Sequence, residues 1–596
     1  MSIERTAVNP PRRILRIWLA ACLIPAAVCG LARAQSTIQG NQGDKPAGGQ
    51  ATGTINGRIL VSDGGNAARA TVALRSVGDG RGSGGQTVLT DEEGNFQFKD
   101  LPPRSYRIFA YGIPGYVQAP TSLLENELTR YYHIGDNATI NFIRGGAITG
   151  RVTDAGGLPV IDVQVSATMK RDAEGNPVPA RSMGVPRYTD DRGVYRLYGL
   201  VPGTYVIAAN KGPNQLSGAS PYEGQVPTYY PSSTIDTAGE ITVGSGGEVS
   251  GADIRYLGSR GQTVSGKILN GDPVSSPLGS GVWVSIFNTT TGAAIDSPFM
   301  RPGEGAEGYA VYGVPDGEYE VVASRGAYEK IEGMISLPRK ISVRGSDLTG
   351  IDIKMIPYSS ISGKLVLSSA PEACPGKPKS AFEEFVLSAK QDPADKNNRI
   401  SWTSYSPGDG IPNEKGEFLL RNLLPSLYRI GIKMPNDNWY LASIKRAAVS
   451  AGVDLSRTGV LLKPGEKASQ IAVTVAAGAA GVQGKLVTGK EGERLPSRMR
   501  IYLVPSESPA AEDPLRYAET GVRSDGSFSL SNLAPGKYRL VARPASDDEL
   551  ADRFTAPIWY ESAERVKLRR EAEAGKNVLE LSSCQQVTDF MLRMNP

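Results

Sequence analysis

The chain has 596 residues, too long for one hydrophobic core, so we expect roughly three to six domains. Glycine (70) and proline (41) are both above average usage, which favours many short strands joined by tight turns. With 65 basic and 61 acidic side chains the charge is nearly balanced, which argues against binding to nucleic acid or to an anionic membrane surface.

Residues 1–34 are predicted to be a secretory signal peptide. A basic stretch precedes an uncharged apolar run at residues 17–31, and an Ala-x-Ala site places cleavage between Ala34 and Gln35. An uncleaved signal anchor and a lipoprotein signal ending at Cys22 are the alternatives. Cleavage would remove five arginines and one glutamate, so the mature chain would carry no net charge. No later apolar stretch reaches the length of a transmembrane helix.

A short Gly-basic-apolar segment recurs five times along the rest of the chain. The intervals between copies are close to the size of one small domain, so internal repetition decides the predicted architecture. The copies are Gly57-Arg58-Ile59, Gly150-Arg151-Val152, Gly266-Lys267-Ile268, Gly363-Lys364-Leu365 and Gly484-Lys485-Leu486.

Most copies are followed by a turn motif, and all are followed by a version of a Leu-x-Pro-Gly-x-Tyr motif. The second repeat shows both, in Thr189-Asp190-Asp191-Arg192-Gly193-Val194-Tyr195 and Leu200-Val201-Pro202-Gly203-Thr204-Tyr205. Glycine supplies the positive φ that the first turn needs, and the alternation after it indicates a half-buried strand. Pro-Gly then sets a second turn, so the block predicts a β-hairpin or a β-arch on one face of a sandwich.

A short apolar strand closes each unit, and the next Gly-basic strand follows closely, so we expect short linkers and a semi-rigid string of modules. The predicted organisation has a disordered leader and five β-sandwich repeats. Their ranges are 35–52 for the leader, then 53–145, 146–258, 259–357, 358–477 and 478–596 for the repeats.

These motifs resemble those of the carboxypeptidase regulatory-like, or transthyretin-like, domain family, whose relatives include adhesin B-type repeats and starch-binding-like folds. The resemblance covers about residues 53–595 and implies an all-β chain of about five Ig-like, seven-stranded sandwiches. The third repeat departs most, because it lacks the Thr-Asp pair. The fourth replaces Pro-Gly with Pro425-Ser426. Motif residues in this family are structural, so the resemblance implies little about function.

The sequence favours a protein without catalytic or cofactor sites. It contains one histidine, His133, which is predicted to lie in a solvated loop and leaves few routes to a zinc site or a Ser-His-Asp triad. Asp-rich turns near Asp91 and Asp190 invite a calcium interpretation, but their spacing does not match a calcium loop and turn chemistry explains them.

Two cysteines, Cys374 and Cys584, remain after the predicted signal peptide. They lie in different predicted repeats, so a disulfide between them would have to staple neighbouring domains. Two separate thiols are the alternative.

Aromatic pairs recur after the Pro-Gly-x-Tyr strand of four repeats. Exposed aromatic rings stack on sugars in many sandwich modules, whereas core aromatics are also expected to recur with a fold. We favour the core interpretation and keep glycan binding as a hypothesis. The pairs are Tyr131-Tyr132, Tyr229-Tyr230, Trp439-Tyr440 and Trp559-Tyr560.

Three functions are open from the sequence. The first is a non-catalytic structural or adhesive scaffold, exported to the periplasm, the outer-membrane surface or the extracellular space. The second is a carbohydrate-binding module array that uses the aromatic pairs. The third is a periplasmic partner of an outer-membrane transporter. The expected partners are a polysaccharide or a surface protein.

Overall fold

A computed structural model describes residues 52–594 with internal gaps. The predicted signal peptide, its cleavage site and nearly all of the leader lie outside the described residues. Within the described part of the chain, no helix is long and apolar enough to cross a membrane. The gaps are residues 66, 79–84, 120–129, 183–185, 211–221, 223, 271–280, 291–293, 297–307, 327–332, 369–373, 375–379, 395–409, 448–451, 489–494, 497, 524, 546–555 and 576.

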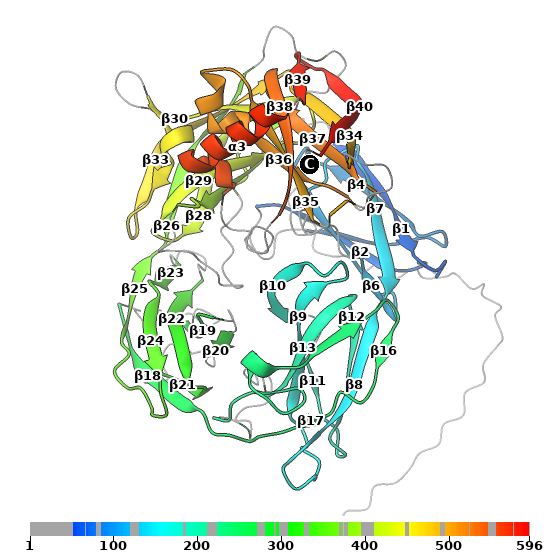
Figure 1. Ribbon diagram of the computed structural model, residues 1–596, viewed down its shortest axis with the longest axis vertical. Helices are drawn as coiled ribbons and strands as arrows, with labels where there is room; N and C mark the ends of the chain where they lie inside the picture. Colours follow the sequence, from blue (N-terminus) through cyan, green and yellow to red (C-terminus); the bar gives the residue numbers. More distant parts are fainter. Residues whose placement is uncertain are drawn as a thin grey trace, which may run out of the picture. The chain divides into compact units, whose positions relative to one another are not determined.

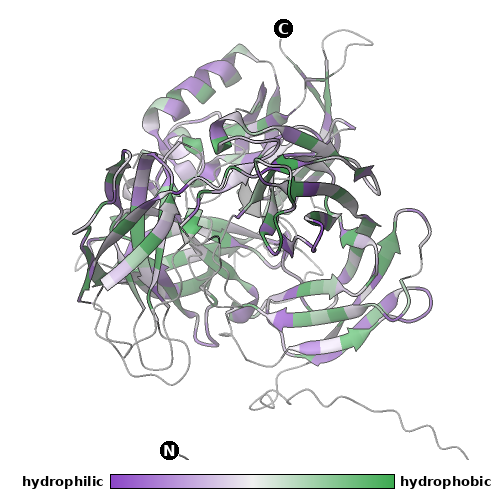
Figure 2. Cartoon of the chain, turned by 90° about the horizontal axis from the view of Figure 1, so that it is seen from below, coloured by the Kyte–Doolittle hydropathy of each residue, from purple (hydrophilic) through white to green (hydrophobic). Residues whose placement is uncertain are grey.

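The described residues form a tandem series of β-sandwich domains, which confirms the predicted fold class (Figure 1). Five large clusters of buried apolar side chains lie along the sequence, and each is drawn almost wholly from one predicted repeat. Along the strands, hydrophobic and hydrophilic residues alternate (Figure 2), as expected where one face of a sheet packs on a core and the other meets solvent.

The first domain has the seven strands that the resemblance implies. They are β1 (Gly53–Val61), β2 (Thr71–Ser76), β3 (Gln86–Leu89), β4 (Asn95–Leu101), β5 (Tyr106–Tyr111), β6 (Tyr116–Gln118) and β7 (Asn137–Arg144). One sheet has the order β4-β1-β7-β6, and the other has the order β3-β2-β5.

The second domain divides its sheets into more and shorter strands. They are β8 (Gly146–Thr153), β9 (Gln164–Asp172), β10 (Pro177–Ser182), β11 (Arg187–Tyr188), β12 (Val194–Leu200), β13 (Gly203–Ala209), β14 (Thr228–Tyr229), β15 (Glu240–Val243), β16 (Glu248–Val249) and β17 (Ile254–Arg255), with the 3-10 helix η2 (Ile235–Thr237). One sheet is built on β12-β8-β16 and the other on β10-β9-β13-β14.

In the third domain the two layers are joined by hydrogen bonds. The strands are β18 (Gln262–Leu269), β19 (Trp283–Asn288), β20 (Ala294–Asp296), β21 (Gly308–Val314), β22 (Gly317–Arg325), β23 (Met334–Ser336), β24 (Arg339–Val343) and β25 (Ile353–Pro357). Strand β23 pairs with β22 on one side and β25 on the other, so the sheet runs continuously from one layer to the next.

The fourth domain has sheets of order β28-β26-β33-β30-β31 and β27-β29-β32. Its elements are β26 (Ser359–Ser368), η3 (Phe382–Glu384), β27 (Val386–Gln391), β28 (Glu417–Leu423), β29 (Leu427–Lys433), β30 (Trp439–Arg446), β31 (Val453–Asp454), α1 (Leu455–Thr458), β32 (Val460–Leu461) and β33 (Lys467–Ala477).

The fifth domain has sheets of order β37-β34-β40 and β36-β35-β38-β39. Its elements are β34 (Ala480–Val487), β35 (Met499–Pro505), η5 (Ala510–Glu512), η6 (Pro514–Arg516), β36 (Ala518–Gly521), β37 (Ser527–Leu533), β38 (Gly536–Pro544), η7 (Ile558–Tyr560), α3 (Ser562–Ala574), β39 (Val578–Leu581) and β40 (Gln586–Arg593).

All five domains share one topology around the opening strand. This strand pairs in parallel with the closing strand of its repeat and antiparallel with the strand that leads into the Leu-x-Pro-Gly-x-Tyr motif. In the first domain, the strands on either side of the Leu-x-Pro motif, β4 and β5, belong to different sheets. The motif is therefore a β-arch there, which resolves the choice between a hairpin and an arch.

Helix α3 was missed by the sequence prediction, which treated the fifth repeat as wholly β. Its 13 residues include many strong helix formers, a signal that the strand-based repeat pattern concealed. Leu568 and Ala572 lie four residues apart on one helix face and are buried, in a cluster with Tyr502 and Trp559. The helix therefore covers the outer face of β35 and β38.

Candidate functional site

The Asp-rich turns use their side chains to hold the backbone. In each turn the side-chain oxygen accepts a hydrogen bond from the backbone N–H two residues later, and in three of them also from the N–H four residues later. These bonds, led by that of Asn95, hold the pKa of Asp91 below its ordinary value. The residues are Asp91, Asp190, Asn413 and Asp525. Their oxygens serve turn geometry, as predicted, and among the described residues no group of three or more His, Cys, Asp or Glu could hold a metal ion.

The threonine before Asp190 has a similar role in the second domain. Thr189 Oγ1 accepts from the backbone N–H of Val163 at 3.0 Å and donates to the carbonyl of Val160 at 2.7 Å. Thr189 is buried, so both bonds are made out of water. Thr90 makes the corresponding bonds in the first domain.

The tyrosine of the Leu-x-Pro-Gly-x-Tyr motif forms a tyrosine corner in all five domains. In four of them its hydroxyl donates to the backbone carbonyl four residues upstream, and in the fourth domain it accepts from the backbone N–H of Leu424 instead. Each ring is buried, so the bond fixes the arch against the core. The tyrosines are Tyr106, Tyr205, Tyr319, Tyr428 and Tyr538.

A left-handed residue precedes the first apolar residue of that motif in every domain. Its φ lies between 56° and 72°, and the pairing with the opening strand shifts register at this point. The sequence carries the signal, because only Asp, Asn and Gly occupy the position. The residues are Asp100, Gly199, Gly313, Asn422 and Asn532.

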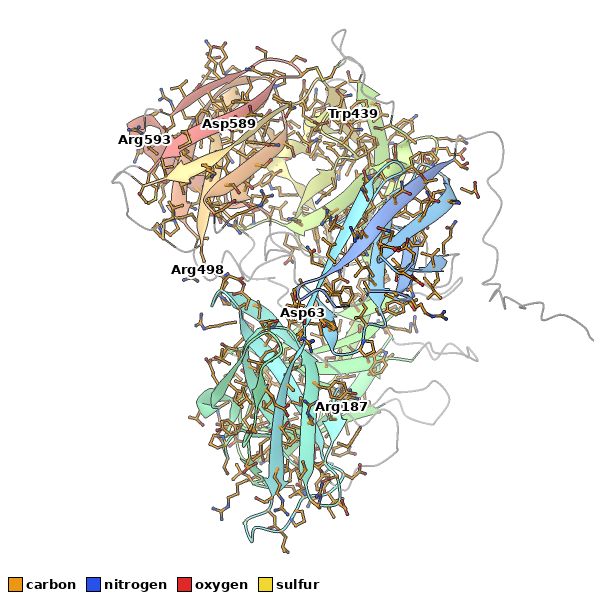
Figure 3. The ribbon with its side chains drawn as sticks, turned by 90° about the vertical axis from the view of Figure 1, so that its right-hand side faces the viewer. Asp63, Arg187, Trp439, Arg498, Asp589 and Arg593 are labelled. Atoms are coloured by element: carbon orange, nitrogen blue, oxygen red, sulfur yellow. A yellow bond between two sulfur atoms is a disulfide. The ribbon has the colours of Figure 1, made fainter. Side chains whose placement is uncertain are left out.

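The opening glycine is required by a close approach of the closing strand. A Cβ on Gly150 would lie 2.1 Å from the carbonyl oxygen of Ala252, and one on Gly484 would lie 2.0 Å from that of Phe590. The closing strand β40 also carries Asp589, labelled in Figure 3, with a φ of 57°. The first residue of the repeat signature is therefore a packing requirement and not a ligand contact.

Each aromatic pair has one buried ring and one half-buried ring. Tyr132, Tyr229, Trp439 and Trp559 are between 5% and 8% exposed. Their neighbours, which are half-buried, are Tyr131, Tyr230, Tyr440 and Tyr560. A pair of fully exposed rings, as the glycan hypothesis requires, is not found at any of these positions.

The buried rings pack in two different ways. Trp439, labelled in Figure 3, lies edge-on to Phe385 in the fourth core and donates through its indole N–H to Ser380 Oγ at 3.1 Å. Trp559 lies edge-on to Tyr502 and is stacked with Tyr517, under helix α3. Both rings have their faces and edges covered by protein.

His133 was expected in a solvated loop, and this prediction is wrong. The side chain is buried, with Nε2 3.0 Å from Ser105 Oγ and 3.1 Å from the carbonyl oxygen of Glu384. Asp136 lies on the other side of the ring, with its carboxylate 3.8 Å from Nδ1. Burial lowers the pKa of His133 from its ordinary value. No motif signalled this contact, because its partner is distant in sequence.

The Ser105–His133–Asp136 contact resembles a catalytic triad only in composition. The Ser105 hydroxyl donates to the Glu384 carbonyl at 2.7 Å, so the His133 Nε2 atom facing it must act as a donor. A general base would need that nitrogen unprotonated, to accept the serine proton. Ser105 is also only 1% exposed. The cluster is therefore a structural contact between the first and fourth domains. The backbone N–H of Ser105 adds a further hydrogen bond to the Glu383 carbonyl at 3.2 Å.

A disulfide joins Cys374 of the fourth domain to Cys584 of the fifth, with Cα atoms 5.4 Å apart. Polar contacts accompany it. The Asn532 side-chain amide donates to the carbonyls of Asn436 and Trp439, at 2.7 and 2.8 Å. The backbone N–H of Ala556 donates to the Gln391 carbonyl at 2.7 Å.

Arg429 anchors the same joint from the fourth domain. Its guanidinium is buried, forms an ion pair with Asp392 and donates to the carbonyls of Ser456 and Arg457. It also lies 4.9 Å from the ring centroid of Tyr560, in the fifth domain. Because the buried guanidinium has these hydrogen-bond partners, it holds the Tyr560 ring in place. Tyr560, the half-buried member of the Trp559-Tyr560 pair, is therefore part of the contact between the fourth and fifth domains.

No protein-family model matches the chain, and no curated protein matches it. Among solved structures, the Bacillus anthracis TIE protein is 13% identical at a TM-score of 0.14, with 51% of this chain and 50% of that chain covered. This chain therefore spans about half the length of that protein. The minor pilin GBS52 of Streptococcus agalactiae is 13% identical at a TM-score of 0.19, covering 34% and 96%.

Two B repeat units of the collagen binding protein of Staphylococcus aureus also match. They are 12% identical at a TM-score of 0.13, with 72% of this chain and 100% of that chain covered.

Proposed function

We propose that this chain is an exported, non-catalytic scaffold whose tandem sandwiches present a binding surface in the periplasm, at the cell surface or outside the cell. The observation that carries the proposal is the structural role of the recurring motif residues. The turn aspartates, corner tyrosines and opening glycines are all engaged in building the sandwich. The recurring motif residues thus build the sandwich, and ligand binding must come from residues outside these motifs.

Contacts between domains support the same proposal. The fourth and fifth domains are linked by a disulfide, and the first and fourth meet at Ser105 and Glu384. A disulfide is typical of proteins folded in an oxidising compartment, which favours export. We also propose membership of the carboxypeptidase regulatory-like family, with the five repeat boundaries predicted from the sequence.

The carbohydrate-binding alternative loses its original support, because every aromatic pair has a buried member. The periplasmic transporter partner remains a prediction for which the described residues offer no specific observation. We therefore retain the scaffold as the first function.

Adhesion under flow tests the scaffold proposal. Beads coated with the full mature chain should be retained on at least one surface in a panel of immobilised polysaccharides and extracellular proteins. Beads coated with an unrelated protein of similar charge are the control. Retention no stronger than that control on every surface would contradict the proposal.

A further inference from the structure

A cleft of about 1320 Å³ is lined by residues of the first and fourth domains. One wall is the outer face of strands β2 and β5, and the other is the segment 411–422, which includes the start of β28. The contact of Ser105 with Glu384 holds the two walls together, since Arg104 and Glu383 beside it also line the cleft. The volume exceeds the roughly 300–1,000 Å³ of typical small-molecule sites, which favours part of a polymer as the ligand.

The first wall places two arginines opposite each other. Arg75 on β2 pairs directly with Arg107 on β5, so their side chains share one face of the sheet. Like charges at directly opposed positions destabilise a sheet. Arg107 also donates to the Tyr131 hydroxyl at 3.2 Å. An anion that accepts hydrogen bonds from both arginines would reduce the repulsion, and guanidinium groups bind carboxylates with paired hydrogen bonds.

Aromatic rings lie beside these arginines on the same face. Phe109 pairs with Ala73 and lies between Arg107 and Tyr111 on the same face of β5. The Arg75 guanidinium lies 5.9 Å from the Phe109 ring centroid. Tyr111 is 50% exposed. Together they form a flat, partly apolar strip flanked by positive charge, a combination that suits sugar rings carrying carboxylates.

The second wall adds further positive charge. Lys415 and Arg421 line it and are exposed. Of the residues described along the cleft, five are cationic (Arg75, Arg104, Arg107, Lys415 and Arg421) and three are carboxylates (Glu383, Glu414 and Glu417). One of the three, Glu417, already accepts a bond from the Asn413 amide at 2.9 Å. The positive excess is local, because the predicted mature chain has no net charge.

From this arrangement we propose that the cleft binds a segment of anionic polysaccharide, with carboxylate groups at Arg75 and Arg107 and sugar rings against Phe109 and Tyr111. The proposal rests on the scaffold function and names the ligand class for one of its surfaces. The residues involved lie outside the recurring aromatic pairs, so the site belongs to one place in the chain and not to every module.

Titration of the full mature chain with polygalacturonate, with neutral dextran of similar length as reference, tests the proposal. The chain should bind polygalacturonate and not dextran, and rising salt should weaken binding. The double variant Arg75→Gln with Tyr111→Ala should bind roughly ten-fold more weakly or worse, because it removes a charge-assisted contact and a stacking surface.

A matched variant in the second domain controls for general effects. Arg187 lies 4.3 Å from the ring centroid of Tyr198, which is 54% exposed, so Arg187→Gln with Tyr198→Ala makes the same chemical change outside the cleft. This variant should bind polygalacturonate as the unaltered chain does. Equal losses in both variants, or tighter binding of poly-glutamate than of polygalacturonate, would overturn the proposal.

The two proposals fail in different ways. Retention of coated beads on some surface, together with no effect of the cleft variant on polygalacturonate binding, would refute the cleft site and leave the scaffold intact. Retention on no surface, together with no binding of polygalacturonate, would refute both.

Discussion

At the scale of single residues, the repeat signature records where two backbones come close or turn sharply. The opening glycines show this most directly, because a methyl group at Gly150 would meet the carbonyl of Ala252 at 2.1 Å and the Tyr195 hydroxyl at 2.9 Å. Tyr195 itself donates to that carbonyl at 2.5 Å. The closing strand, the ring and the glycine therefore form one packed unit.

Gly150→Ala is expected to destabilise the second domain by about 2–4 kcal/mol, because a backbone carbonyl and a buried ring must both move. The measurement is denaturant unfolding of the full chain, with hydrogen exchange in β8 and β12 to locate the effect. Gly244→Ala, where a Cβ meets nothing within 4 Å, is the control and should change stability little. Equal effects of the two substitutions would contradict the packing argument.

At the scale of elements, helix α3 is an addition to the sandwich that depends on a few buried contacts. Leu568 is fully buried at 0% exposure, whereas Val566 on another face is 37% exposed. An isolated helix of 13 residues is marginal in water, so its stability must come from packing on β35 and β38.

Leu568→Ala should therefore release the helix from the sheet at a cost of about 2–4 kcal/mol in local stability. Hydrogen exchange along residues 562–574 would report this, together with increased exposure of Trp559 to fluorescence quenchers. Val566→Ala removes side-chain atoms from the same helix without opening the core, and its exchange should match that of the unaltered chain. Equally fast exchange in both would contradict the role of Leu568 burial, and slower exchange in both would show that helix propensity controls α3, because alanine is the better helix former.

The elements also show which features of the fold could be predicted from the sequence. The opening, motif and closing strands were predictable because alternation, turn residues and glycine recur with the fold. Helix α3 was not, because it occurs in one repeat and a search for repetition passes over it. The arginines of the cleft were missed for a different reason, because their proximity depends on the pairing of β2 with β5. Burial of His133 could not be foreseen, because it depends on a residue 251 positions away.

At the scale of the whole chain, specific contacts join domains that the sequence treats as beads on a string. The disulfide and Arg429 link the fourth domain to the fifth, and the His133 cluster links the first to the fourth. The cleft depends on the second of these links. Conditions that weaken the contact at His133 should therefore also weaken ligand binding.

Acidification is such a condition. Burial lowers the pKa of His133 from 6.5, and it outweighs Asp136 and the Glu384 carbonyl, which favour the charged ring; Lys433 acts in the same direction as burial. When the first and fourth domains separate, the exposed His133 ring binds a proton at a higher pH than the buried ring does. The contact is therefore stable above about pH 6.5 and loses stability as the pH falls below that value.

The single histidine makes this dependence directly measurable. Nuclear magnetic resonance of the imidazole should give a pKa below 6.5 in the full chain. The Ser105 amide donates to Glu383, and its protection factor, which corrects the exchange rate for the slowing of intrinsic amide exchange in acid, should decrease as the pH falls through that range. In His133→Gln the Ser105 amide should lose most of this pH dependence, because the substituted side chain does not titrate. An ordinary histidine pKa, or an unchanged pH profile in the variant, would show that the contact between the first and fourth domains does not depend on a neutral His133, and polygalacturonate binding would then be insensitive to mild acid.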